Sequence, residues 1–192
     1  MKLNINQMRK LIYVINSSID GCLDHTIGVP DEELFDFYIN LVRNAGIFVY
    51  GRITYELMVP YWPDIAKNPA GNSKADVEFA EAFDAVEKVV FSKSLEKAEG
   101  RNSRIVRTNA EDEIRKLKQE EGKDIYTGGV ALPSYLIGLG LVDEYIFTIM
   151  PVIAGKGRRL MEAISIQEKL GLKLVEKKVS RSGSVILHYV NA

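Results

Sequence analysis

A glycine-arginine turn near residue 51 has the composition of an anion-binding site. Gly51-Arg52-Ile53-Thr54 follows the apolar run Ile47 to Tyr50, which predicts a buried strand leading into a helix. A helix N-terminus leaves backbone N–H groups free, glycine lets a phosphate approach closely, and arginine adds a planar fork of donors. Gly51, Arg52 and Thr54 are therefore candidates for binding a dinucleotide phosphate. Taken alone, the motif fits an ordinary strand-to-helix turn equally well.

A second glycine turn, Gly128-Gly129, stands between the extended run Asp124 to Thr127 and an apolar stretch with helical spacing. Two glycines at such a turn allow a flat or anionic ligand to approach the backbone, so we include the next residues, Val130 and Ala131, in this candidate site. No G-x-G-x-x-G is present there, which argues against a conventional Rossmann fingerprint. The alternative is a helix entry that simply needs glycine.

Two further loops combine small residues with cations. Ser92 and Lys93 follow a predicted strand and could bind a 2′-phosphate, which would select NADP over NAD, although alone they fit a polar exit loop better. Gly155 and Gly157 flank Lys156 in a basic loop that could bind a phosphorylated or carboxylated substrate. The alternative for the second loop is a solvated basic turn.

Carboxyl groups are candidates for a proton donor, since a positioned acid can deliver a proton to a reacting group. Asp20 lies in a turn-like segment, and Glu33 lies in the acidic start of a predicted helix beside Asp31, Glu32 and Asp36. A turn-stabilising aspartate and an acidic first helical turn are the alternatives, and the second is favoured for Glu33.

The elements that must position these residues alternate between strand and helix over the first two-thirds of the chain, which favours a largely parallel sheet covered on both faces. The predicted strands and helices are residues 9–16, 31–45, 47–50, a helix starting at 51, 75–86, 88–91, 104–107, a helix opened by a capping box at 108–111, 124–127, a helix after 129, and 145–149. A hairpin is predicted from Leu172 to Val179 and Val185 to Val190, so the sheet should be mixed. Residues 60–74 hold three prolines and are predicted to be loop, with Trp62 as its anchor rather than a lid over substrate.

The composition restricts the class of protein. The chain has 192 residues, which we interpret as one domain, 1–192, with residues 1–8 as a possible loose extension and Met8 as a possible start. The net charge of −1 gives no basic field for nucleic acid, and the apolar run Leu11 to Ile15 is too short to cross a membrane. One cysteine and two histidines argue against a disulfide or a metal site, with His188 structural, and favour a reducing, cytoplasmic setting.

Residues 128–161, GGVALPSYLIGLGLVDEYIFTIMPVIAGKGRRLM, resemble the pattern of the dihydrofolate-reductase-like superfamily, in particular the C-terminal reductase domain of the riboflavin-biosynthesis deaminase/reductase. Met161 stands where that family usually has phenylalanine. Three shorter segments also agree with the family: the turn at residues 51–56, Val90-Phe91-Ser92-Lys93, and Ser18-Ile19-Asp20-Gly21. The resemblance extends from about residue 9 to 190.

The resemblance implies an α/β, three-layer dihydrofolate-reductase-like fold with a mixed, mainly parallel central sheet and a C-terminal β-hairpin. It implies NADPH as cofactor and hydride transfer to a C=N or C=O of a small heterocyclic substrate, similar to the reduction of 5-amino-6-(5-phosphoribosylamino)uracil. Dihydrofolate reductase, or a nucleotide-binding protein without turnover, are the alternatives, and a homodimer is plausible. Its site assignments are cofactor contacts at Ile15, Asn16, Gly51, Arg52, Thr54, Ser92, Lys93, Gly128, Gly129, Val130 and Ala131, substrate contacts at Ser18, Gly155 and Gly157, and catalytic roles for Asp20 and Glu33.

Overall fold

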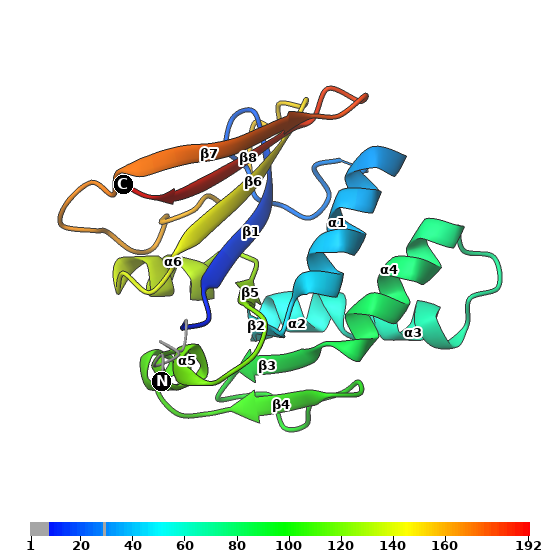
Figure 1. Ribbon diagram of the computed structural model, residues 1–192, viewed down its shortest axis with the longest axis horizontal. Helices are drawn as coiled ribbons and strands as arrows, with labels where there is room; N and C mark the ends of the chain where they lie inside the picture. Colours follow the sequence, from blue (N-terminus) through cyan, green and yellow to red (C-terminus); the bar gives the residue numbers. More distant parts are fainter. Residues whose placement is uncertain (1–7, 29) are drawn as a thin grey trace, which may run out of the picture.

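The computed structural model describes residues 8–28 and 30–192, and an eight-stranded sheet runs through its centre in the order β4-β3-β2-β5-β1-β6-β8-β7 (Figure 1). The strands are β1 (Leu11–Ser18), β2 (Ile47–Gly51), β3 (Glu87–Phe91), β4 (Ser103–Val106), β5 (Ile125–Thr127), β6 (Glu144–Met150), β7 (Leu172–Val179) and β8 (Val185–Asn191). Every pairing from β4 to β6 is parallel, whereas β8 runs antiparallel to both β6 and β7. The predicted mixed, mainly parallel sheet with a C-terminal hairpin is confirmed.

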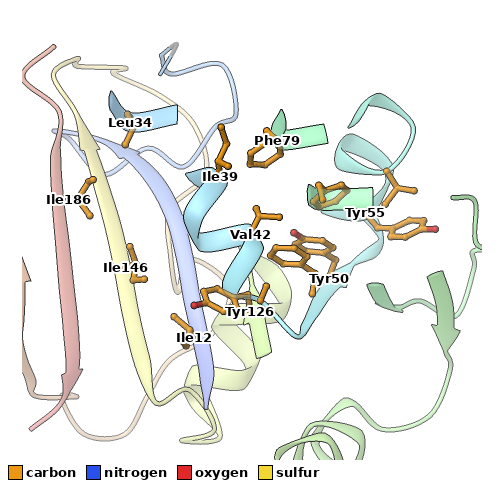
Figure 2. Packing of buried hydrophobic residues seen from close by; sticks show 14 of the residues in the cluster. Ile12, Leu34, Ile39, Val42, Tyr50, Tyr55, Phe79, Tyr126, Ile146 and Ile186 are labelled. Atoms are coloured by element: carbon orange, nitrogen blue, oxygen red, sulfur yellow. The ribbon is translucent and has the colours of Figure 1, made fainter. Parts of the chain in front are cut away.

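Helices cover both faces of the sheet. They are α1 (Glu32–Asn44), α2 (Arg52–Met58), α3 (Tyr61–Lys67), α4 (Lys74–Ala85), α5 (Ala110–Gln119) and α6 (Ala131–Gly138). The cores on the two faces are separate: Leu34 and Val42 of α1 and Phe83 of α4 belong to one cluster, and Leu117 of α5 and Leu136 of α6 to the other. Figure 2 shows the first cluster, in which Leu34, Ile39 and Val42 of α1 lie among side chains of the sheet and Phe79 of α4.

Helix α3 is a correction, because residues 60–74 were predicted to be loop. Pro60 is its N-cap and Pro63 lies in its first turn, where a missing N–H breaks no helical hydrogen bond. Its Trp62 ring packs against Phe79 of α4 and Phe35 of α1, at centroid distances of 4.4 and 6.3 Å. These contacts support Trp62 as an anchor that holds α3 on the core.

The start of α5 also differs from prediction. A capping box was predicted over residues 108–111, but the N-cap is Asn109, whose side chain accepts from the Glu111 backbone N–H at 3.0 Å. Asparagine ranks above threonine as an N-cap, so the helix begins one residue later. The first strand likewise starts later than predicted, at Leu11, and the Arg9 backbone N–H donates to the Lys118 carbonyl of α5 at 2.9 Å instead of to a neighbouring strand.

The registers leave β5 shorter than both of its neighbours at the carboxyl end of the sheet. The β1–β5 pairing ends at Tyr13 opposite Thr127, while β1 continues beside β6 as far as Ser18. On the other side β2 continues beside β3 to Gly51. We call the place where β5 stops between these longer strands the β5 step.

No helix in the described part of the chain is both long and apolar enough to cross a membrane. The prediction of a loose extension over residues 1–8 lies, for residues 1–7, outside the described residues.

Candidate functional site

The Gly128-Gly129 turn lies at the β5 step and touches two neighbouring elements. Gly129 has φ of 87°, where other residues are strained, and a Cβ there would overlap the Thr54 hydroxyl of α2. A Cβ on Gly128 would come within 3.3 Å of the Val14 carbonyl oxygen of β1. Tyr13 donates a 3.0 Å hydrogen bond to the Gly129 carbonyl. The fold therefore brings the glycine pair and Thr54 into contact, and this packing requires glycine at position 129.

The start of α2 lies beside the start of α6. Gly51 is the N-cap of α2, and no side chain caps this helix start. A Cβ on Gly51 would lie 3.6 Å from Leu132 Cβ of α6. Arg52 donates to Glu56 at 2.9 Å, but both side chains are about half exposed, so this pair contributes little and leaves guanidinium donors for an anion. At the start of α6, the N-cap Val130 is buried and the first helical residue, Ala131, is exposed.

Ser92 and Lys93 lie at the end of β3 in a loop that is internally braced. Ser92 is buried, and its hydroxyl accepts from the Leu95 backbone N–H at 2.9 Å. Arg107, which the sequence analysis missed, donates to the Lys93 and Leu95 carbonyls at 3.2 and 2.7 Å. Ser92 therefore shapes the loop, while the Lys93 side chain is exposed and free to meet a ligand.

Asp20 is the anchor of the second glycine loop. Its carboxylate accepts from the Ser18 hydroxyl at 2.6 Å and from the backbone N–H groups of Ala154 and Gly155 at 2.9 and 2.8 Å. Arg159 also donates to the Asp20 carbonyl. The hydrogen bonds to the carboxylate, that of Ser18 first and then those of Ala154 and Gly155, lower the pKa of Asp20 to about 2. A carboxylate held in this form suits a loop-ordering residue and does not suit a proton donor.

Gly157 closes the same loop against the chain that follows β1. It has φ of 131°, and a Cβ would overlap the sulfur of buried Cys22. The Arg158 carbonyl accepts from the Leu23 backbone N–H at 2.8 Å. The fold therefore brings Ser18, Asp20, Gly155 and Gly157 into one substructure.

Glu33 is engaged by the C-terminal hairpin. Its carboxylate pairs with Lys178 of β7 at 3.1 Å and accepts from the Arg181 backbone N–H at 3.2 Å. The hydrogen bond from Lys178 is the main cause that lowers the pKa of Glu33. Its neighbour Asp31 accepts from the Ser182 backbone N–H at 2.9 Å. Both acids thus tie α1 to the β7–β8 turn, and this geometry gives no support to Glu33 as a proton donor.

A polar cluster that the sequence analysis missed lies between α1 and the sheet. The Tyr38 hydroxyl lies 2.5 Å from Asn16 Oδ1 of β1 and 2.9 Å from Thr148 Oγ1 of β6. Burial raises the pKa of Tyr38 to about 12. From the sequence, Tyr38 was predicted only as part of the apolar stripe of a helix. Its hydroxyl, which needs a hydrogen-bond partner when buried, was the one feature that pointed to a polar contact. Ile15, by contrast, packs in the core on the opposite face, so its side chain is not presented to a ligand beside Asn16.

The sheet order arranges the candidate groups in a line along the carboxyl edge. Lys93 follows β3, Arg52 follows β2, Gly129 follows β5, and Asn16 lies in β1. The line runs from two cations, through a glycine turn, to a neutral amide. Ligands of open α/β sheets bind outside the carboxyl ends of the strands, so this edge is the candidate site.

One cavity lies at the opposite end of the strands. It measures about 910 Å³ and is lined in part by Arg43, Arg104 and Glu87. Its arginines are already paired, Arg43 with Glu78 at 2.7 Å and Arg104 with Glu87 at 2.9 Å. We therefore assign it no ligand.

Comparison with known proteins agrees with the fold. The family model described as "RibD C-terminal domain" matches residues 9–188. The uncharacterized protein YyaP of Bacillus subtilis (strain 168) is 29% identical over 190 residues, covering 97% of this chain and 96% of YyaP. The uncharacterized protein YwjB of the same strain is 27% identical over 198 residues, covering 96% and 99% of the two chains.

Solved structures show the same architecture at low identity. A putative riboflavin biosynthesis protein from Shewanella sp. PV-4 superposes with a TM-score of 0.69 at 16% identity, covering 95% of this chain and 99% of that one. A deaminase/5-amino-6-(5-phosphoribosylamino)uracil reductase from Thermotoga maritima gives 0.67 at 15% identity, over 96% of this chain and 57% of that one. Dihydrofolate reductase from Enterococcus faecalis, complexed with NADP(H), gives 0.58 at 15% identity over 95% and 96%. The expected dihydrofolate-reductase-like fold is thereby confirmed.

Proposed function

We propose that this chain, which belongs to the family of RibD C-terminal domains, is an NADPH-dependent reductase. The observation that carries the proposal is the order of groups along the carboxyl edge, from Lys93 and Arg52 through the Gly128-Gly129 turn to Asn16. A 2′-phosphate suits the exposed lysine, a pyrophosphate suits the arginine and the glycine turn, and an uncharged ring suits the neutral end.

The proposed reaction is hydride transfer to a C=N or C=O of a small heterocycle, similar to the 5-amino-6-(5-phosphoribosylamino)uracil reductase activity named for the Thermotoga maritima relative. NADPH, when bound, supplies the hydride. The work of the chain is to hold the two reactants in register and keep water from the transferred hydride. The loop anchored by Asp20 lies beyond β1 and β6, next to the neutral end of the line, where we place the substrate.

Binding calorimetry with NADPH and NADH tests the cofactor assignment. We expect NADPH to bind more tightly than NADH. Arg52→Ala should weaken the binding of both nucleotides about tenfold, and Lys93→Ala should weaken the binding of NADPH alone, because each variant removes a charge-assisted contact. Arg115→Ala is the matched control, since Arg115 forms an exposed i,i+4 pair with Glu111 just as Arg52 does with Glu56. If the unaltered protein bound neither nucleotide at millimolar concentration, the proposal would be wrong.

Two alternatives have direct tests. The case for dihydrofolate reductase is weakened because Glu33 is engaged with the hairpin. A steady-state assay with dihydrofolate at high enzyme concentration tests this alternative, and no turnover would remove it. A nucleotide-binding protein without turnover would bind NADPH yet leave it unoxidised by a panel of imines, carbonyls and pterins. The homodimer implied by the resemblance stays a prediction, checked by light scattering of the purified protein.

A further inference from the structure

Asn16 occupies a part of β1 that is open on one side. The last β1–β5 pair is Tyr13 with Thr127, so from Val14 onward β1 has no ladder partner on the β5 side. The opposite side is still closed, because Asn16 pairs with Thr148 of β6. Asn16 therefore borders the β5 step, one strand away from the Gly128-Gly129 turn.

The hydroxyl of Tyr38 has one proton, which determines how its two hydrogen bonds run. Asn16 Oδ1 can only accept, so Tyr38 donates to it, and the Thr148 hydroxyl must donate to the Tyr38 oxygen. Thr148 is fully buried and Tyr38 is part of α1, so the Tyr38 hydroxyl that binds the amide is itself held in place. The oxygen of the Asn16 amide is thus fixed towards α1.

The nitrogen of the same amide is left over. Asn16 Nδ2 makes no hydrogen bond to another residue within 8–28 and 30–192, and it is not among the buried side-chain atoms that lack a partner there. An amide nitrogen offers two N–H donors and no acceptor. The two hydroxyls of this cluster, those of Tyr38 and Thr148, are uncharged at neutral pH. The matching ligand group is therefore a neutral carbonyl oxygen.

We infer that Asn16 binds the carboxamide oxygen of the nicotinamide ring through its NH₂ group, and that Tyr38 is the positioning residue that fixes the amide for this contact. The inference rests on the proposed function, because it takes the dinucleotide to run along the carboxyl edge. With the phosphates at Lys93, Arg52 and the glycine turn, the end of the dinucleotide that reaches β1 is the nicotinamide, which has no phosphate. Nicotinamide has a single carbonyl, on its carboxamide.

A pair of ligands that differ in the nicotinamide group tests the inference. NADP⁺ and 2′-phospho-ADP-ribose share every phosphate, and only the first has the ring. We would titrate both by calorimetry into the unaltered protein, Asn16→Ala, Tyr38→Phe and Tyr145→Phe. Tyr145→Phe is the control. It also removes a buried tyrosine hydroxyl, but this hydroxyl contacts the Val142 carbonyl near the amino end of β6, away from Thr148.

Asn16→Ala is expected to weaken the binding of NADP⁺ about five- to tenfold, which corresponds to one hydrogen bond, and to leave the affinity for 2′-phospho-ADP-ribose unchanged. Tyr38→Phe should weaken the binding of NADP⁺ by a smaller factor, roughly two- to fivefold, because the Asn16 amide is present but no longer fixed. The affinity for 2′-phospho-ADP-ribose should again stay the same. Tyr145→Phe should change neither affinity. The ratio of the two affinities is the decisive readout, since damage to the fold alone would weaken both ligands together.

The outcomes separate this inference from the function on which it rests. Equal losses for both ligands, or no loss for either, would overturn the role of Asn16 and Tyr38 while the nucleotide site stands. Failure of the unaltered protein to bind either ligand would overturn the proposed function and the inference with it.

Discussion

At the scale of the residue, the contact between Gly129 and Thr54 makes the sharpest prediction about the site. Gly129→Ala places a methyl group on the Thr54 hydroxyl and forces alanine into a left-handed conformation. We expect a loss of roughly 1–2 kcal/mol in the free energy of unfolding from the backbone alone, more from the clash, and loss of nucleotide binding. Denaturant unfolding and calorimetry measure both effects. The double variant Gly129→Ala with Thr54→Ala should relieve the clash but not the strain of the backbone. Full recovery of the free energy of unfolding in the double variant would contradict this account.

Asp20 gives a pH prediction. Its pKa is lowered from 3.8 to about 2 in the folded chain, so its hydrogen bonds stabilise the protein above pH ~4, and this contribution is lost as the pH falls towards 2. Asp20→Asn should therefore lower the melting temperature at neutral pH, and the difference from the unaltered protein should shrink between about pH 4 and 2. Thermal melts across that range measure it. A difference independent of pH would show that the charge of Asp20 is not what holds the loop.

At the scale of the element, Trp62 is the aromatic contact of α3 with the core, beside the buried Pro63 and Ile65. Trp62 packs between Phe35 and Phe79, whereas its neighbour Tyr61 is 57% exposed. We expect Trp62→Ala to lower the free energy of unfolding by roughly 2–4 kcal/mol, a little below the usual cost for a fully buried tryptophan. Tyr61→Ala should cost much less, and equal losses in denaturant unfolding would contradict the anchor role.

The amino ends of the central strands share a buried carboxylate. Glu144 of β6 accepts from Lys10 at 2.6 Å and lies 2.7 Å from His188 Nε2 of β8. Desolvation raises the pKa of Glu144, but the hydrogen bonds from Lys10 and His188 outweigh it and lower the pKa overall. Glu144→Gln should therefore destabilise the protein at neutral pH, and less so as the pH falls below the ordinary glutamate pKa. Melting temperatures at pH 7 and pH 4 test this, and an equal loss at both would exclude the charge as the cause.

At the scale of the whole molecule, nucleotide binding should stabilise the fold. A ligand that binds only the folded chain adds RT ln(1 + [L]/Kd), which is about 2.7 kcal/mol at one hundred times Kd. We expect NADPH to raise the melting temperature more than NADH at equal concentration, and Arg52→Ala to reduce both shifts. A scanning-fluorimetry titration measures this. Equal shifts from the two nucleotides would remove the proposed 2′-phosphate contact.

The sequence by itself determined the class of fold and most elements, because they depend on local patterns. Alternating strand and helix periods predicted the parallel sheet, and the turn residues at 181–183 predicted the hairpin. The glycines at 51 and 128–129 marked the candidate site before any geometry was known. The one element missed, α3, begins with prolines, which are read as loop signals although a first helical turn tolerates them.

Only the tertiary structure decided which side chains meet. Asn16, Tyr38 and Thr148 are separated by 22 and 110 residues along the chain, and Asp20 binds a loop 134 residues away. Such pairings depend on strand order and register, because a shift of one residue turns every side chain to the opposite face of the sheet. Strand order and register are fixed by packing across the whole sheet, so no local pattern could have revealed that Glu33 faces the hairpin while a tyrosine on the same helix faces the candidate site.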